Sequence, residues 1–244
     1  MTALDGSRVL VTGAYRGIGA ACARAFAAAG ASVACADIRQ PDATLASLAG
    51  GTGHVALVSD VADERSVTAM FAEVERRFGG LDVLVHCAGV IHEAPLLETD
   101  VAAFDRVIGI NLRGSFLVGK AAIALMQGRG GRVILTASDL AYSGRETFSP
   151  YVASKHGVLG LTRSWAKEFA PGILVNALCP GPIDTEMLGA AEMSEEWRAR
   201  ELDIPLARFG QPEEIAAMAV FLAGPGGSFV TGQGIGVNGG SVMP

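Results

Sequence analysis

Short hydrophobic runs alternate with longer helical patterns along the whole chain. Seven of these runs predict strands, at residues 8–12, 32–36, 54–58, 82–86, 132–136, 174–178 and 234–238. They are continuously apolar, which is typical of strands covered on both faces. Helical patterns lie between them, for example at residues 18–29, 66–78 and 212–223. This strand–helix repeat, with no linker, predicts one α/β domain over residues 1–244 with a doubly wound, seven-stranded parallel sheet.

Composition narrows the class of protein. The chain has 244 residues, half of them hydrophobic, and a net charge of −6 without any basic run. Nucleic acids and anionic membranes select clustered Lys and Arg, so neither is expected as a partner. The N-terminus shows no signal pattern, and the apolar runs are too short to span a bilayer. We therefore expect a soluble cytoplasmic protein.

Cysteine and histidine spacing gives no sign of a metal site. The four cysteines, Cys22, Cys35, Cys87 and Cys179, form no C-x-x-C pair, and the four histidines have no metal-ligand spacing. All four cysteines lie in apolar surroundings, which predicts buried, reduced thiols. No metal is expected.

A glycine-rich turn, TGAYRGIG at residues 12–19, follows the first predicted strand and begins the first predicted helix. Glycines at such a turn let the backbone approach a pyrophosphate, which then lies at the helix N-terminus. The turn alone could reflect packing, but its place between strand and helix predicts a Rossmann-like dinucleotide site. Gly13, Arg16, Gly17, Ile18 and Gly19 are its candidate residues.

An acidic residue at the end of the second strand bears on cofactor choice. Asp37 lies about twenty residues beyond the turn, where a carboxylate can accept hydrogen bonds from the adenosine ribose and repel a 2′-phosphate. This favours NAD. Arg16 and Arg39 favour NADP instead, because a guanidinium can bind that phosphate. NAD is the preferred prediction, and a solvated turn carboxylate is the structural alternative for Asp37.

These motifs together resemble a known family. Gly13, Gly17 and Gly19 follow the T-G-x-x-x-G-x-G form of the classical short-chain dehydrogenase/reductase (SDR) family, and the resemblance extends from Arg8 to Gly240. It implies a nicotinamide-dependent oxidoreductase and a homotetramer packed through the C-terminal region.

Tyr151 and Lys155 are one helical turn apart, directly after Pro150. Residues four apart share a helix face, and a nearby cation favours the phenolate and lowers the pKa of a phenol. Such a pair suits proton transfer at a substrate oxygen, although a surface ion-dipole pair has the same spacing.

Ser138 follows the strand at 132–136, at the sheet edge where ligands bind. The SDR resemblance implies that Ser138, Tyr151 and Lys155 are catalytic, that Lys155 also binds the nicotinamide ribose, and that Asn111 kinks a helix and holds a relay water.

Other cofactor contacts are implied only by the resemblance. The loop PGPIDT is expected to cover the nicotinamide through Pro180, Gly181, Ile183 and Thr185, and Asp60 and Val61 to contact the adenine, although Asp60 could instead cap a helix. One segment departs from the family: N-N-A-G reads HCAG, with Cys87 before Ala88 and Gly89. These three remain expected cofactor contacts, and Cys87 has no evident neighbouring base.

Two segments are expected over the substrate, residues 139–149 and a lid around 184–205. The second contains apolar residues that can form the inner face of a lid: Met187, Leu188, Met193, Trp197 and Leu202. His92 and Glu93 are further candidates. The lid mildly favours a hydrophobic or cyclic alcohol.

The predicted function is hydride transfer between NAD and a secondary alcohol or ketone, with Tyr151 as general acid/base. An NADPH-dependent 3-oxoacyl thioester reductase is the first alternative. A dinucleotide-sensing protein without turnover is the second, but it would not need all four of Asn111, Ser138, Tyr151 and Lys155. Epimerases and dehydratases usually need an additional substrate domain.

Overall fold

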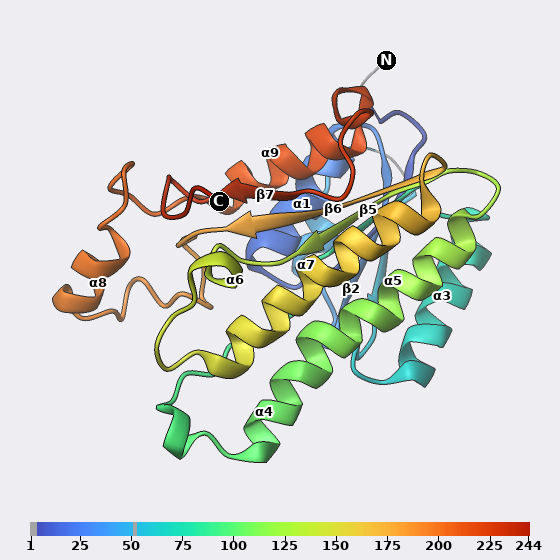
Figure 1. The fold of residues 1–244 in the computed structure, drawn as a ribbon. Coiled ribbons are helices and arrows are strands. Elements are labelled where there is room, and N and C mark those ends of the chain that lie inside the picture. Colours follow the sequence, from blue (N-terminus) through green and yellow to red (C-terminus); the bar gives the residue numbers. More distant parts are fainter. Residues whose placement is uncertain (1–3, 51–52) are drawn as a thin grey trace.

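The chain folds into three layers, with a parallel sheet between two layers of helices (Figure 1). The computed structural model describes residues 4–50 and 53–244, so residues 1–3, where the sequence predicts no signal pattern, lie outside it. The sheet has seven strands in the order β3-β2-β1-β4-β5-β6-β7. Their bounds are Arg8–Thr12 (β1), Ser32–Asp37 (β2), Val55–Val58 (β3), Val83–His86 (β4), Gly131–Thr136 (β5), Ile173–Pro180 (β6) and Gly234–Val237 (β7). The predicted doubly wound sheet is confirmed.

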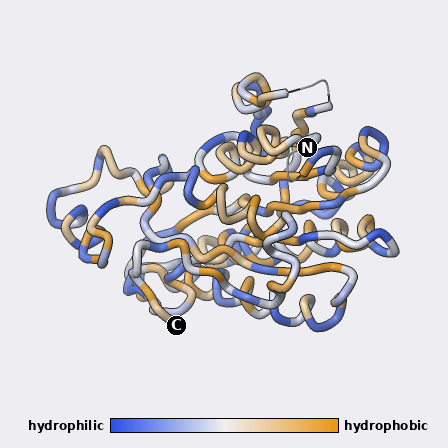
Figure 2. Tube along the Cα trace, turned by 90° about the horizontal axis from the view of Figure 1, so that it is seen from above, coloured by the Kyte–Doolittle hydropathy of each residue, from blue (hydrophilic) through white to orange (hydrophobic). Residues whose placement is uncertain are grey.

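Helices cover both faces of this sheet, and the strands divide their side chains between two hydrophobic cores. On one face lie α1 (Gly17–Ala28) and α9 (Pro212–Ala223), where Phe26 of α1 packs in one cluster with Val9 and Val11 of β1. On the other lie α3 (Glu64–Phe78), α4 (Val101–Ile108), α5 (Gly114–Met126) and α7 (Ser149–Phe169). Figure 2 shows hydrophobic residues along the central strands and hydrophilic ones toward the periphery. Burial of each large apolar side chain contributes about 1.5–3 kcal/mol.

Local signals in the sequence account for where the helices begin and end. The Asp63 carboxylate accepts hydrogen bonds from the backbone N–H groups of Arg65 and Ser66, which caps α3. Gly79, in the left-handed region at φ 69°, ends the same helix. The short helices α2 (Asp42–Ala46), α6 (Leu140–Ser143) and α8 (Glu195–Glu201) complete the α-helical elements of the described residues.

A π-helical turn, Gly109–Arg113, joins α4 to α5 and carries Asn111. The joined segment Val101–Met126 is 26 residues long and is apolar enough to cross a membrane. This differs from the expectation that every apolar run is too short. Half of its most apolar window is buried within the domain, where it packs against α3 and α7, so packing accounts for its composition.

Candidate active site

A cleft of about 810 Å³ opens at the carboxyl ends of the strands. It lies where the strand order reverses between β1 and β4, the position at which open parallel sheets bind ligands. All the predicted cofactor residues line it: Gly13, Arg16, Gly17, Ile18, Gly19, Asp37, Asp60, Val61, Cys87, Ala88, Gly89, Tyr151, Lys155, Pro180, Gly181, Ile183 and Thr185. Ser138 lines it as well, whereas Asn111 lies just behind its wall.

The glycine turn has no room for side chains. A Cβ atom on Gly19 would lie 2.1 Å from the Gly13 carbonyl oxygen, and one on Gly13 would lie 2.6 Å from the Ala88 nitrogen. Gly13 also has a positive φ of 68°, which favours glycine. Among the described residues no side chain caps the start of α1, so its first N–H groups face the cleft. This arrangement fits the phosphates of a dinucleotide.

Polar groups at the end of β2 surround the expected ribose position. The Asp37 carboxylate accepts hydrogen bonds from the backbone N–H groups of Tyr15 at 3.0 Å and Arg39 at 3.2 Å. The Arg39 guanidinium lies over the Tyr15 ring, 5.5 Å from its centroid. Arg16 forms an ion pair with Glu186 from the loop after β6. The carboxylate is therefore fixed in the cleft, while one of the two candidate guanidiniums already has an anionic partner.

Asp60 and Val61 form the wall of the cleft after β3. The Asp60 carboxylate accepts a hydrogen bond from Ala62 N–H at 2.9 Å, while Val61 packs against Gly114. The N-terminus of α3 is capped by Asp63, so the alternative that Asp60 caps this helix is wrong.

The HCAG segment, which differs from the family's N-N-A-G motif, is held in place by hydrogen bonds to neighbouring elements. Cys87 N–H donates to the Thr12 carbonyl at 3.1 Å, and Val90 N–H donates to Asn111 Oδ1 at 2.8 Å. Asn111 Nδ2 in turn donates to Val90 O and to Ser154 Oγ on α7, at 2.9 and 3.0 Å. The Asn111 side chain thus ties the loop after β4 to α7, and its polar atoms already have partners.

Ser138 and Tyr151 meet at the carboxyl end of β5. Hydrogen bonding with Ser138 lowers the pKa of Tyr151, and the Ser138 hydroxyl donates to Asp139 Oδ1 at 3.1 Å. α7 begins at Ser149, and Pro150 and Tyr151 lie in its first turn. Asp139 is in turn held by Ser241 near the C-terminus, with Oγ donating to Oδ2 at 2.5 Å. Asp139, itself held by Ser241, and Tyr151 therefore surround the serine hydroxyl.

Lys155 lies one turn further along α7, almost fully buried. Its Nζ donates to the Thr136 carbonyl at 2.7 Å and lies 5.6 Å from the centroid of the Tyr151 ring. A Cβ atom on Gly89 would lie 3.6 Å from this Nζ and 3.2 Å from Asn111 Oδ1. Lys155 and Asn111 therefore flank the same glycine at the cleft wall.

The predicted lowering of the Tyr151 pKa is wrong for this structure. Burial raises the pKa of Tyr151 to about 12, a hydrogen bond to Ser138 lowers it, and the Asp139 carboxylate raises it further. Burial also lowers the pKa of Lys155 to about 8. The ammonium is directed at the Thr136 carbonyl, so its effect on the phenol is smaller than that of burial. Tyr151 is consequently a protonated phenol at neutral pH.

The loop after β6 closes the cleft from above the glycine turn. The Thr185 methyl carbon would lie 3.4 Å from a Cβ atom on Gly17, so the loop contacts the turn directly. Asp184 N–H donates to the Gly210 carbonyl at 2.8 Å, which anchors the loop beside buried Ile183.

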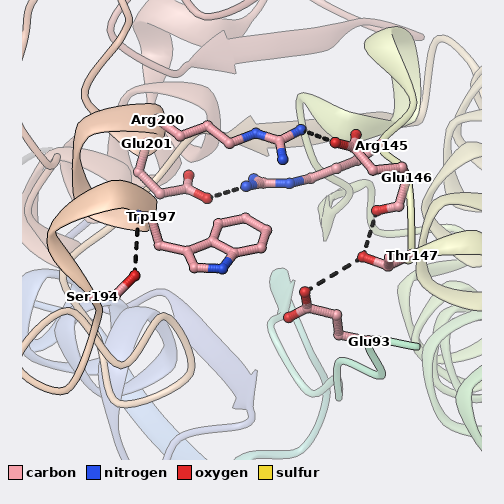
Figure 3. Close-up of polar contacts among 8 residues, drawn as sticks. All are labelled: Glu93, Arg145, Glu146, Thr147, Ser194, Trp197, Arg200 and Glu201. Carbon is pink, nitrogen blue, oxygen red and sulfur yellow. Dashed lines mark hydrogen bonds and ion pairs between the residues drawn. The ribbon is translucent and has the colours of Figure 1, made fainter. Parts of the chain in front are cut away.

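The far end of the cleft is enclosed by α8 and the segment before α7 (Figure 3). Arg145 forms an ion pair with Glu201, and Arg200 forms one with Glu146. The centroid of the Trp197 ring lies 5.0 Å from the Arg145 guanidinium and 5.1 Å from that of Arg200. The ion pair of Arg145 and Glu201 is largely buried, with side chains 14% and 11% exposed. These contacts hold residues 195–201 over the cleft.

Of the expected apolar residues in this region, Met187, Leu188, Met193 and Trp197 line the cleft, and Leu202 does not. Glu93 lines it too, unlike His92. Asp139 and Arg145 also line the cleft; both lie in the segment 139–149 that was expected over the substrate, but neither was assigned a role. Adjacency to Ser138 could have indicated Asp139, but no motif marks Arg145.

The prediction that all four cysteines are buried holds for Cys22, Cys35 and Cys179 but not for Cys87. Cys87 is half-buried and lines the cleft. Among the described residues, no group of three or more His, Cys, Asp and Glu side chains could hold a metal ion.

The fold and the cleft define a dinucleotide-binding α/β oxidoreductase. Residues 13–242 match the family model described as enoyl-(acyl carrier protein) reductase. The chain belongs to the short-chain dehydrogenase/reductase family, whose members bind a nicotinamide cofactor.

Relatives and solved structures agree with this assignment. The chain is 39% identical to the 3-oxoacyl-(acyl-carrier-protein) reductase FabG of Thermotoga maritima, covering 98% of this chain and 99% of the relative. It is 42% identical to the cis-4-hydroxycyclohexanecarboxylate dehydrogenase of Sinomonas cyclohexanicum, over 95% and 94% of the two chains. A putative 2-deoxy-d-gluconate 3-dehydrogenase from Agrobacterium tumefaciens with bound NADP superposes with a TM-score of 0.90 at 38% identity, covering 97% and 96%.

Proposed function

We propose that the protein transfers a hydride between NAD and a secondary alcohol or ketone. The observation that carries this proposal is that Ser138, Tyr151 and Lys155 share one cleft with the glycine turn and Asp37. A reactive carbonyl placed at Ser138 and Tyr151 would thus lie in the same cavity as a dinucleotide bound at the other end.

Each residue has a distinct part in the proposed reaction. When bound, a nicotinamide cofactor would supply or accept the hydride. Ser138, held by Asp139, orients the substrate oxygen, and Tyr151 donates its phenolic proton to that oxygen as a ketone is reduced. Lys155 stabilises the phenolate left behind and binds the ribose. Asn111 positions the loop at Gly89, and a role in a water relay remains a further prediction. The high pKa of Tyr151 supports the acid role, because the proton is present at neutral pH.

Replacing Tyr151 with Phe tests the mechanism. We expect turnover to fall by about 10²–10⁴-fold, the usual contribution of a general acid, while NADH affinity changes by less than about twofold. Tyr142→Phe is the matched control, because its hydroxyl contacts the Gly234 carbonyl outside the cleft wall. Steady-state rates and NADH fluorescence titrations measure both effects. Turnover of Tyr151→Phe at the wild-type rate contradicts the proposed role.

The choice of NAD over NADP rests on the end of β2. The fixed Asp37 carboxylate would repel a 2′-phosphate, and Glu186 already neutralises Arg16. Arg39 remains available for a phosphate, and the Agrobacterium relative has NADP bound. Comparison of kcat/KM with NADH and NADPH decides between them. Asp37→Ser should shift the ratio toward NADPH, and an NADPH preference in the unaltered enzyme would overturn the choice of NAD.

The second candidate function is reduction of a 3-oxoacyl thioester. It is favoured by two relatives that are named 3-oxoacyl-(acyl-carrier-protein) reductase. One is from Thermotoga maritima, and the other, 41% identical, is from Staphylococcus aureus. A panel that compares acetoacetyl thioesters with cyclic secondary alcohols separates the two candidates. NADH binding without turnover of any panel member would favour a sensing role instead.

The remaining proposals concern the setting of the reaction. Residues 184–205 act as a substrate lid, supported by the contacts of Trp197 and Glu201 with Arg145. The enzyme is cytoplasmic and forms a homotetramer, as the family resemblance implies, and light scattering of the purified protein tests the assembly.

A further inference from the structure

Two cysteines from distant parts of the chain meet beside the cofactor cleft. Cys22 lies on α1 and is fully buried, whereas Cys87 directly follows β4 and lines the cleft. Both side chains belong to the hydrophobic cluster in which α1 packs on β1 and β4, and hydrogen bonding between the two thiols is the largest influence on the pKa of each. The glycine turn makes this contact possible, because the absence of Cβ atoms on Gly13 and Gly19 brings α1 close to the backbone at Cys87.

The two thiols of this pair differ in character. The hydrogen bond with Cys22 lowers the pKa of Cys87, burial opposes this effect, and Thr136 and the charge of Lys155 lower the pKa further. The Thr136 hydroxyl donates to Cys87 Sγ at 3.5 Å. The hydrogen bond and burial raise the pKa of Cys22 well above its usual value. One sulfur is therefore open to the cleft and polarised as a nucleophile, and the other is a protonated thiol in contact with it.

The remaining two cysteines provide an internal contrast. Burial raises the pKa of Cys35 to about 12 and that of Cys179 to about 11. Both are buried. Thiolate is the reactive form, so neither should compete with Cys87 for an oxidant.

We propose that Cys87 and Cys22 form a redox-active thiol pair at the cleft wall, which a hydroperoxide converts into an intramolecular disulfide. The Cys87 thiolate attacks a peroxide oxygen, the O–O bond breaks, and hydroxide leaves, so the sulfur is oxidised to a sulfenic acid and the peroxide is reduced. The Cys22 thiol then displaces the sulfenic hydroxyl as water and forms the S–S bond. Each step conserves atoms and charge, and hydrogen peroxide is the only co-reactant.

Access to the pair depends on the cleft, because Cys87 is the member that faces it. A dinucleotide bound at the glycine turn and at Gly89 would cover the Cys87 sulfur from solvent. The pair therefore reacts when the cleft is free of cofactor and is shielded when cofactor is bound.

Peptide mass spectrometry after mild hydrogen peroxide treatment of the full-length enzyme tests the proposal. Trypsin places the four cysteines in four different peptides, residues 17–24, 25–39, 78–106 and 168–198. Free thiols are blocked under denaturing conditions before a non-reducing digest. We expect a cross-linked product of peptides 17–24 and 78–106 that lacks two hydrogens, while the other two peptides carry the blocking group.

Alkylation kinetics give a second readout on the unaltered enzyme. Thiolate fraction changes about tenfold per pKa unit, and lower intrinsic nucleophilicity at lower pKa offsets about half of that on a logarithmic scale. Since the pKa of Cys87 is lowered while burial raises that of Cys179 to about 11, iodoacetamide should label Cys87 faster than Cys179. Saturating NADH should slow both this labelling and the cross-link.

Single substitutions assign the roles of the two sulfurs. In Cys22→Ala the cross-link should disappear and Cys87 should accumulate as a sulfenic acid that dimedone traps. In Cys87→Ala, Cys22 should stay reduced because it has no access to solvent. Cys35→Ala, the matched control at another buried cysteine, should keep the cross-link. Circular dichroism establishes that each variant is folded.

Three results would overturn the proposal. The first is an unaltered enzyme whose four cysteine peptides all remain reduced at peroxide concentrations that label other exposed thiols. The second is oxidation of Cys35 or Cys179 before Cys87. The third is a disulfide between two chains, visible on a non-reducing gel. If NADH leaves the rate of cross-linking unchanged, the shielding by cofactor is wrong.

Discussion

Burial of the Lys155 ammonium should carry a measurable cost in folding free energy. The pKa of Lys155 is about 8, against an ordinary value of 10.5, because burial disfavours the charged form, while Cys87 and Cys179 only partly offset that effect. Lys155→Met removes the charge and keeps a flexible apolar chain of similar length. The perturbation therefore separates the electrostatic cost of the lysine from its packing.

The sign of the effect follows from proton linkage. Between the folded and unfolded pKa values, the unfolded chain binds more protons than the folded chain, so stability rises with pH in this window. The cost is fully present below pH 8 and fades toward pH 10.5. A difference of 2.5 between those values corresponds to about 3 kcal/mol at neutral pH. From about pH 7 to about pH 9.5 the unaltered enzyme should recover about 2 kcal/mol relative to Lys155→Met.

Urea unfolding of both proteins across this pH range measures the difference directly. Other groups titrate in both proteins, so only the difference between the two free energies of unfolding is interpreted. At neutral pH the variant should be the more stable protein, apart from the lost hydrogen bond to Thr136, although it should lack turnover. A difference that stays flat across the range would refute a buried, charged Lys155 with a depressed pKa.

Three further predictions concern packing and the lid. Gly19→Ala should weaken NADH binding, because its Cβ would lie 2.1 Å from the Gly13 carbonyl oxygen; Gly109→Ala, with nothing within 4 Å, should leave binding unchanged in the same titration. Gly119→Ala should destabilise the fold by about 1–3 kcal/mol in urea unfolding, since its Cβ would lie 2.3 Å from Trp165. Glu201→Gln should raise substrate KM without changing NADH affinity, whereas Glu146→Gln, in the exposed pair, should change neither constant appreciably. Equal effects of the two glutamate variants would argue against α8 as a substrate lid.

Much of the fold could be predicted because its signals are local. Each of the seven predicted strands overlaps an observed one, and α9 begins and ends at the predicted residues. The largest difference is at β6, which extends to Pro180 because the chain stays paired with β7 up to that residue. The gathering of the expected cofactor residues in one cleft was also predictable, since the ends of parallel strands meet at one edge of the sheet.

What the sequence missed depends on contacts between distant segments. Arg145 belongs to no motif, and only the packing of α8 brings Glu201 and Trp197 to it. The direction of the Tyr151 pKa was predicted wrongly from helical spacing alone. Spacing places a cation nearby, but burial decides the pKa, and burial is a property of the whole fold.

The sequence by itself determined the order of strands and helices, the glycine turn and the family of the enzyme, because periodicity and backbone sterics act over a few residues. The tertiary structure alone decided the protonation of Tyr151 and Lys155, the packing of α8 beside the cleft and the proximity of Cys22 to Cys87. Those features depend on desolvation and on distances through space, and neither can be read from neighbours along the chain.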